Sequence, residues 1–383
     1  MAHAVFRAEH IGSMLRPPAL LEARAVLEGN QYETVAGSRA FAELKQLEDT
    51  AIREAVALQE QVGLTVVTDG ELRRRSWYQD FVLGLNGTRI AFIDPAHTGG
   101  TVSLPFQDAA GADELPGHQV QVEGRLSRSG DPFTEAYAYL RGLTRHTAKV
   151  SLPSPTMLHF FGGRSMIDAR VYPDLDLFWD DLVTIYREQV GALYAAGCRY
   201  LQIDDVTWAV ACDPRAEAAI RARGETPQGL FTRYADVLNR ILAGVPQDMK
   251  VGLHTCRGNN RGKWMADGGY ELISEIIFKS INIDTYFMEY DTERAGDFSP
   301  LRHVPPGKTV VLGLVSTKTP QLEAPAQLRA RIEEAARHLP LDHLCLSPQC
   351  GFASNFMGNP LTIDDERAKL KLVVDVARDV WGA

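Results

Sequence analysis

The sequence predicts an α/β fold, namely a (β/α)8 barrel of the TIM type with a β-rich insertion around residues 88–130. Short β-branched or apolar runs that end in polar residues alternate with amphipathic helices along the chain. Strands that alternate with helices form parallel βαβ units. There are eight such runs, the number that this barrel requires: AEHIGS, LTVVTDGE, AKVSLPSP, RYLQIDDV, KVGLHTC, TYFMEYD, TVVLGLVST and HLCLSPQCG.

The segments between the runs carry the helical signal. Apolar residues recur with a period of about 3.6 residues over 43–63 and 177–197. Gly63 and Gly197 follow the last periodic residues, as expected at the C-terminal ends of helices. Pro227 stands near the start of the next predicted helix, where proline is tolerated.

One insertion interrupts the alternation. Residues 88–130 contain TRIAFID, a Gly-Gly turn, TVSLPF and HQVQVEGRL, which predict short antiparallel strands beside the third strand. No linker rich in Pro, Gly or Ser is long enough to divide the chain, so we expect one catalytic domain over residues 1–383. A hydrophobic fraction of 45% is sufficient for one large core.

The composition argues against several classes of protein. A net charge of -9 and a pI of about 5.6 disfavour a nucleic-acid-binding protein. The sequence has no run of about 20 apolar residues that could span a membrane, and no apolar signal-peptide region at its start. Five widely spaced cysteines suit a reducing compartment, so we expect a cytoplasmic protein. The oligomeric state is left open, a homo-oligomer included.

Ionisable residues gather at the ends of the predicted strands. In a barrel of this kind the chemistry takes place at the carboxyl ends of the strands. Burying this many ionisable groups is costly unless they are used, which favours an enzyme. The strand-end residues are Ser13, Asp69, Glu71, Ser154, Asp204, Asp205, His254, Cys256, Glu289, Asp291, Ser316, Lys318 and Cys350.

Four of these residues could form a metal site. His254 and Cys256 stand two apart on a strand, so their side chains point to the same side. Glu289 ends the next strand and Cys350 ends the eighth, and imidazole, thiolate and carboxylate groups suit Zn²⁺. The spacing does not match a zinc finger. The alternative is that His254 and Cys256 are ordinary core residues.

Six pieces of the sequence together resemble one family: HIGS, VVTDGE, LQIDD, HTC, FMEYD and SPQCG. They resemble the catalytic C-terminal half of cobalamin-independent methionine synthase, and the likeness covers nearly the whole chain. The family folds as a (β/α)8 barrel, and its full-length members carry a second, N-terminal barrel. A chain of 383 residues has room for one barrel and is similar to the short, single-barrel branch.

The resemblance implies both a metal site and a substrate site. It implies that Zn²⁺ is held by His254, Cys256, Glu289 and Cys350. It implies that the amino acid part of a thiol substrate, homocysteine in the synthases, is held by Ser13, Glu71 and Asp204. Zinc lowers the pKa of a thiol, and the thiolate then attacks a methyl or other alkyl carbon of a donor molecule.

The sequence departs from the family at Lys318. Full-length synthases have an Asp-x-His pair after the seventh strand, and this histidine is thought to protonate the leaving group. Here Ser316 and Lys318 stand at those places. A lysine of ordinary pKa, about 10.4, is a poor proton donor at neutral pH unless its surroundings lower that pKa. We predict a catalytic role for Lys318 because it stands at the place of the family's histidine.

The identity of the donor stays open for the same reason. Methyltetrahydrofolate is the expected donor, and a methylated corrinoid, a small methylated compound or an epoxide opened by a thiol cofactor are alternatives. A metal-free decarboxylase acting on a porphyrinogen would not need two cysteines and a histidine together. A zinc store or methyl carrier would not need carboxylates such as Glu71 and Asp204 at strand ends.

Overall fold

The computed structural model describes residues 4–28, 39–92, 100–113 and 118–382. Its centre is a parallel six-stranded sheet with the strand order β12-β11-β10-β9-β8-β7. The strands are β7 (Val150–Pro153), β8 (Tyr200–Asp205), β9 (Lys250–Thr255), β10 (Thr285–Glu289), β11 (Thr309–Val315) and β12 (Leu344–Pro348). They correspond to the last six predicted runs, and each pairs with its neighbour in the chain. The predicted α/β class with parallel strands is confirmed.

The first two predicted runs form shorter elements. Strand β1 (Val66–Val67) pairs in parallel with β6 (Thr147–Ala148), which ends just before β7 begins. The first run is an extended segment rather than a regular strand. Its backbone bonds to β12, where the Glu9 N–H donates to the carbonyl of Leu346 at 2.9 Å.

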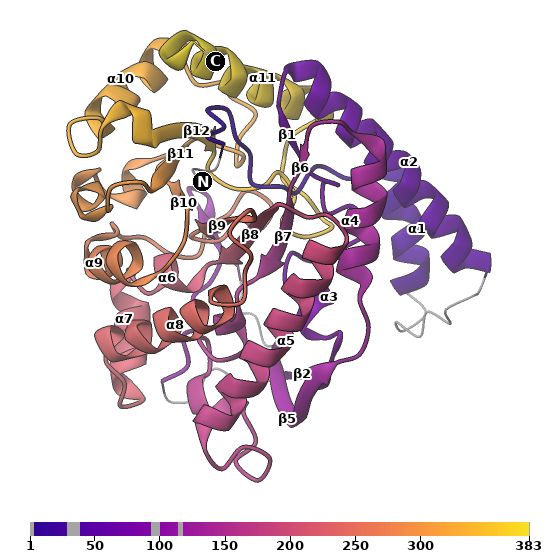
Figure 1. Ribbon diagram of the computed structural model, residues 1–383, viewed down its shortest axis with the longest axis vertical. Coiled ribbons are helices and arrows are strands. Elements are labelled where there is room, and N and C mark those ends of the chain that lie inside the picture. The colour runs from indigo at the N-terminus through magenta and orange to yellow at the C-terminus, as the bar shows by residue number, and fades with distance from the viewer. Residues whose placement is uncertain (1–3, 29–38, 93–99, 114–117, 383) are drawn as a thin grey trace.

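The helices lie around the strands (Figure 1). They are α1 (Pro18–Glu28), α2 (Arg39–Val62), α3 (Gln79–Val82), α4 (Pro132–Leu143), α5 (Leu175–Ala195), α6 (Thr207–Val210), α7 (Pro214–Ala222), α8 (Pro227–Leu242), α9 (Glu271–Ser280), α10 (Pro325–Ala335) and α11 (Ile363–Trp381). The predicted helical segments are confirmed. Pro227 is the first residue of α8, and the Thr226 side chain caps that helix by accepting from the Gly229 N–H. No helix in the described ranges is long and apolar enough to cross a membrane.

The insertion is a β-ribbon beside the sheet. Strands β2 (Leu85–Phe92) and β5 (His118–Arg128) pair antiparallel, and β3 (Gln107–Asp108) pairs antiparallel with β4 (Gly111–Ala112). The prediction of a strand over residues 101–106 was wrong. That segment packs on the loop after β7 instead, with the Val102 N–H donating to the Phe161 carbonyl, and Pro105 has no N–H for a ladder. Residues 93–94 and Gly99 of the predicted pattern lie outside the described residues.

Candidate metal centre

A cavity of about 390 Å³ opens at the carboxyl ends of the strands. The loops after the strands and the β-ribbon insertion form its walls. Six of the eight predicted site residues line this cavity: Ser13, Glu71, Asp204, His254, Cys256 and Cys350. Glu289 and Lys318 do not belong to this lining.

Three residues form a compact group of possible metal ligands. One donor atom each from His254, Cys256 and Cys350 lies within 4.8 Å of the other two. His254 is on β9, Cys256 follows that strand directly, and Cys350 lies two residues beyond β12. The parallel strands bring these ends to the same edge, and the two sulfur atoms lie 3.5 Å apart.

The chemistry of this group fits a zinc ion. All three residues are buried. Neither ring nitrogen of His254 has a hydrogen-bond partner among the described residues, although a buried polar atom normally has one. The Gly258 N–H donates to the Cys256 sulfur at 3.2 Å. The hydrogen bond between the two sulfurs lowers the pKa of the Cys350 thiol well below its usual value and raises that of Cys256. Two sulfur atoms and one unpaired imidazole are donors that zinc prefers.

Glu71 lines the cavity, and one of its two carboxylate oxygens is free to accept a further hydrogen bond from a ligand. Its backbone has a φ of 57°, an uncommon conformation for a residue with a side chain. Its Oε1 accepts from the Ser151 hydroxyl at 2.6 Å and lies 3.5 Å from Arg74 Nη1. Its Oε2 is buried and has no hydrogen-bond partner in the described structure. The strained backbone and the spare oxygen both indicate a functional carboxylate.

Asp204 is the second carboxylate of the cavity. It lies at the end of β8, in register with His254 of β9. Burial raises the pKa of Asp204 to about 7, with His254 opposing the rise and Glu71 adding to it. The side-chain amide of Gln202 supports this carboxylate, since Gln202 Nε2 donates to Asp204 Oδ1 at 2.7 Å.

Ser13 approaches the group from the first segment. The Ala353 N–H donates to its hydroxyl at 3.4 Å, and the Phe352 N–H donates to its carbonyl at 2.9 Å. A Cβ atom on Gly351 would lie 1.9 Å from Ser13 Oγ, so only glycine allows this close approach. Ser13 is thereby tied to the loop that carries Cys350.

The sequence did not single out Arg16, whose guanidinium holds the loops around the cavity together through hydrogen bonds to their carbonyls. Arg16 is buried, and its guanidinium donates to the carbonyls of Glu71 and Arg74, each at 3.1 Å, and of Asn355 at 3.3 Å. It also donates to the carbonyl of Ala353. A basic residue three positions after Ser13, in HIGSMLRP, was the available signal.

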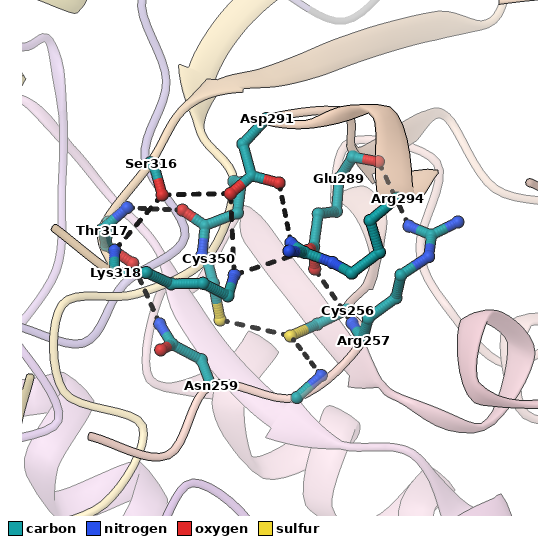
Figure 2. A network of polar contacts seen from close by, with 12 residues as sticks. Cys256, Arg257, Asn259, Glu289, Asp291, Arg294, Ser316, Thr317, Lys318 and Cys350 are labelled. Carbon is teal, nitrogen blue, oxygen red and sulfur yellow. Dashed lines mark hydrogen bonds and ion pairs between the residues drawn. The ribbon is translucent and has the colours of Figure 1, made fainter. Parts of the chain in front are cut away.

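Glu289 and Lys318 belong to a buried ion cluster next to the two cysteines (Figure 2). The cluster also contains Asp291 and Arg294. Burial alone would lower the pKa of Lys318, but the carboxylates of Glu289 and Asp291 outweigh it and raise that pKa. This direction is opposite to the one that proton donation at neutral pH requires. Asp291 was recognised as a strand-end residue, whereas Arg294 gave no signal in the sequence.

Comparison with known proteins shows the family to which the chain is similar. The family described as "Cobalamin-independent synthase, Catalytic domain" matches residues 157–379. The chain is 39% identical to the uncharacterized protein YxjH of Bacillus subtilis, over 99% of this chain and 95% of that protein. It is 24% identical to a methionine synthase of Pyrococcus abyssi, over 76% of this chain and 72% of that protein.

Solved structures show the same fold. A candidate vitamin-B12-independent methionine synthase from Listeria monocytogenes superposes with a TM-score of 0.74 at 32% identity, over 100% of this chain and 99% of that one. A B12-independent methionine synthase from Shewanella superposes with a TM-score of 0.70 at 20% identity, over 98% of each chain. The chain therefore belongs to the cobalamin-independent methionine synthase family and corresponds to its catalytic domain.

Proposed function

We propose that the protein is a zinc-dependent methyltransferase that moves a methyl group to the thiol of homocysteine and forms methionine. The family supports a methyltransferase of this kind. The observation that carries the proposal is that the buried group of His254, Cys256 and Cys350 lines the same cavity as two carboxylates, Glu71 and Asp204.

In this proposal His254, Cys256 and Cys350 hold the metal ion. A zinc ion supplies a Lewis acid that favours the thiolate form of a substrate thiol near neutral pH. The three side chains need little rearrangement, because their donor atoms already lie within 4.8 Å of one another. All three are buried, so water has little access to the group.

The other end of the cavity suits an amino acid. An α-ammonium group needs acceptors, and we assign this role to Glu71, whose Oε2 has no partner in the described structure, and to Asp204. The hydroxyl of Ser13 and the nearby loop N–H groups suit the α-carboxylate. Together they would orient the thiol toward Cys256 and Cys350.

The methyl donor is assigned more broadly. We propose a methyltetrahydrofolate, because the cavity lining includes the rings of Trp77, Tyr78, Phe106 and Phe161, which could stack on a flat ligand. A second candidate is a thiol alkyltransferase that uses a methylcorrinoid, a small methylated compound or an epoxide. The raised pKa of Lys318 favours keeping this alternative, because the residue is poorly suited to protonate a folate leaving group.

Metal analysis and a donor assay test the proposal. The purified protein should contain zinc, and Cys350→Ala should lose it. Zinc-loaded enzyme with homocysteine and methyltetrahydrofolate should yield methionine. A protein that binds no zinc would refute the metal assignment. Reaction with methylcobalamin or an epoxide, but not with the folate, would select the alternative donor.

We also propose that the strands close into the predicted barrel. The first segment bonds to β12 on one side, and on the other the Met14 N–H donates to the Gly70 carbonyl just beyond β1. A small buried cluster contains residues from six of the eight predicted runs, as expected inside a closed ring of strands. Its members are Ile11, Val66, Tyr200, Phe287, Val311 and Cys345.

A further inference from the structure

The two carboxylate oxygens of Glu71 have different surroundings. Oε1 accepts from the Ser151 hydroxyl at 2.6 Å and lies 3.5 Å from Arg74 Nη1. Oε2 is buried and has no hydrogen-bond partner among the described residues. A buried polar atom normally has a partner, because burial without one costs free energy. Oε2 is therefore the oxygen left for a ligand in the cavity that Glu71 lines.

Arg74 holds Ser151 in place. Arg74 Nη1 donates to the Ser151 hydroxyl oxygen at 3.0 Å, and Arg74 Nη2 donates to the Ser151 carbonyl at 2.8 Å. A hydroxyl has one hydrogen, so the Ser151 hydroxyl accepts from the guanidinium and donates to Glu71. The guanidinium also lies over the ring of Phe133, 4.5 Å from the ring centre. The result is a chain of hydrogen bonds from Arg74 through Ser151 to Glu71.

Two members of this chain lie behind the cavity wall. Ser151 stands between Val150 and Leu152 inside β7, where a hydroxyl is unfavourable unless it is hydrogen-bonded. Arg74 is 6% exposed and Ser151 is 5% exposed. Of the three residues, Glu71 alone belongs to the cavity lining that the described residues form. Arg74 and Ser151 therefore act on a ligand only through Glu71.

The backbone of Glu71 is held at both of its peptide groups. Its φ of 57° costs free energy for a residue with a side chain. Its N–H donates to Asp69 Oδ1 at 2.9 Å. Its carbonyl accepts from the Arg74 N–H at 2.9 Å and from Arg16 Nη2 at 3.1 Å. With the backbone fixed, the carboxylate can turn only about its side-chain bonds, and the hydrogen bond from Ser151 opposes that rotation.

We propose that Ser151 and Arg74 are positioning residues that hold the carboxylate of Glu71 so that its free oxygen accepts the α-ammonium group of the thiol substrate. This inference rests on the proposed function, in which that substrate is homocysteine. A carboxylate that is already oriented binds a cation more tightly than a mobile one, because less conformational freedom is lost on binding. The two residues thereby strengthen the preference for thiols that carry an α-ammonium group.

Calorimetric binding of two thiols to the zinc-loaded protein tests the positioning role. Homocysteine carries the α-ammonium group, whereas 4-mercaptobutanoate has the same thiol and carboxylate without it. Ser151→Ala should weaken homocysteine binding by about tenfold, the scale of one hydrogen bond to a charged group, and 4-mercaptobutanoate binding by less than about twofold. Ser151→Thr keeps the hydroxyl and should restore the preference for homocysteine. If Ser151→Ala weakens the binding of both thiols equally, or of neither, the positioning role is wrong.

Thr285→Val provides the matched control. Thr285 is the first residue of β10, at the end of the sheet opposite the cavity. It is buried, and its hydroxyl lies 2.8 Å from the Thr309 hydroxyl. The variant removes one buried hydroxyl from the same sheet without touching a carboxylate, so the preference for homocysteine should stay unchanged. A loss of preference equal to that in Ser151→Ala would mean that the effect comes from the fold and would overturn the inference.

A second pair of variants tests the inference if Ser151→Ala does not fold. Arg74→Lys keeps the positive charge but loses the planar fork that holds Ser151, so the preference for homocysteine should fall by about threefold or more. In a Glu71→Gln protein no carboxylate is left to position, so the same change should have no further effect. An equal effect in both backgrounds would overturn the inference. A wild-type protein that binds neither thiol would defeat the proposed function itself.

Discussion

Replacing Glu366 by glutamine should remove a defined part of the pH dependence of stability. Glu366 lies in the first turn of α11, is 2% exposed, and its Oε1 accepts from the Leu15 N–H at 3.1 Å. Burial raises the pKa of this carboxyl from its usual 4.5 to about 8. The folded protein therefore keeps a proton there near neutral pH that the unfolded chain has already released.

The size of this pH effect on the unfolding free energy follows from the difference between the pKa of Glu366 in the folded and the unfolded protein. A folded-state pKa above the unfolded value gives stability that is fully present below pH 4.5 and is lost as the pH rises through about 8. The loss is about 1.4 kcal/mol per pH unit inside this window. Between pH 6 and pH 9 the carboxyl should therefore cost about 3 kcal/mol of unfolding free energy. A glutamine side chain at this position would carry no charge and could still accept from the Leu15 N–H.

Urea denaturation of both proteins at pH 6 and pH 9 measures this contribution. The unfolding free energy of Glu366→Gln relative to wild type should increase by about 3 kcal/mol between the two pH values. Glu334 on α10, whose side chain is 46% exposed, provides the control, since Glu334→Gln should give no such change. A difference between Glu366→Gln and wild type that stays constant from pH 6 to pH 9 would refute the reasoning.

Three further substitutions test particular contacts. Lys149 is fully buried and lies 3.2 Å from Glu9, so Lys149→Met should destabilise the fold by about 3–5 kcal/mol in urea denaturation, and adding Glu9→Gln should recover part of the loss. Gly351→Ala places a methyl group 1.9 Å from Ser13 Oγ, so the affinity for homocysteine should fall while zinc content is unchanged. Arg16→Ala should raise KM for homocysteine more than it lowers kcat, and an unchanged KM would mean that the loops keep their places without it.

The regular parts of the fold were predictable because periodic sequence signals report on local structure. Strands β7 to β12 each stand at a predicted run, and Pro227 and Gly197 mark helix ends as expected. Residues 101–106 look like a strand by composition, but the Val102 N–H donates to the carbonyl of Phe161, which belongs to the loop after β7. A pairing between segments almost sixty residues apart leaves no local pattern.

In the candidate site too, some residues give a local sequence signal, whereas others are defined only by long-range contacts. His254, Cys256 and Cys350 were predictable because strand ends in a parallel sheet meet at one edge, and their chemistry is unusual for buried positions. The contacts of Glu289 were not predictable. They depend on Arg294, which belongs to a short 3-10 helix (Glu293–Ala295) after β10 and whose direction only the tertiary structure defines.

The charges around the two cysteines suggest why a lysine is compatible with this site. Within the ion cluster Glu289 and Asp291 balance Arg294 and Lys318, so the cluster as a whole adds no net charge. Arg257 is different: its buried guanidinium donates to the carbonyls of Gly268 and Glu289 and to the Tyr270 hydroxyl.

The pKa of Arg257 is raised despite its burial, because Tyr270 and the carboxylate of Glu289 favour the charged form. Glu289 therefore interacts with Arg257 as well as with Arg294 and Lys318. Lys318 contributes a fixed positive charge beside Glu289 and Asp291, and its raised pKa makes it a poor proton donor at neutral pH.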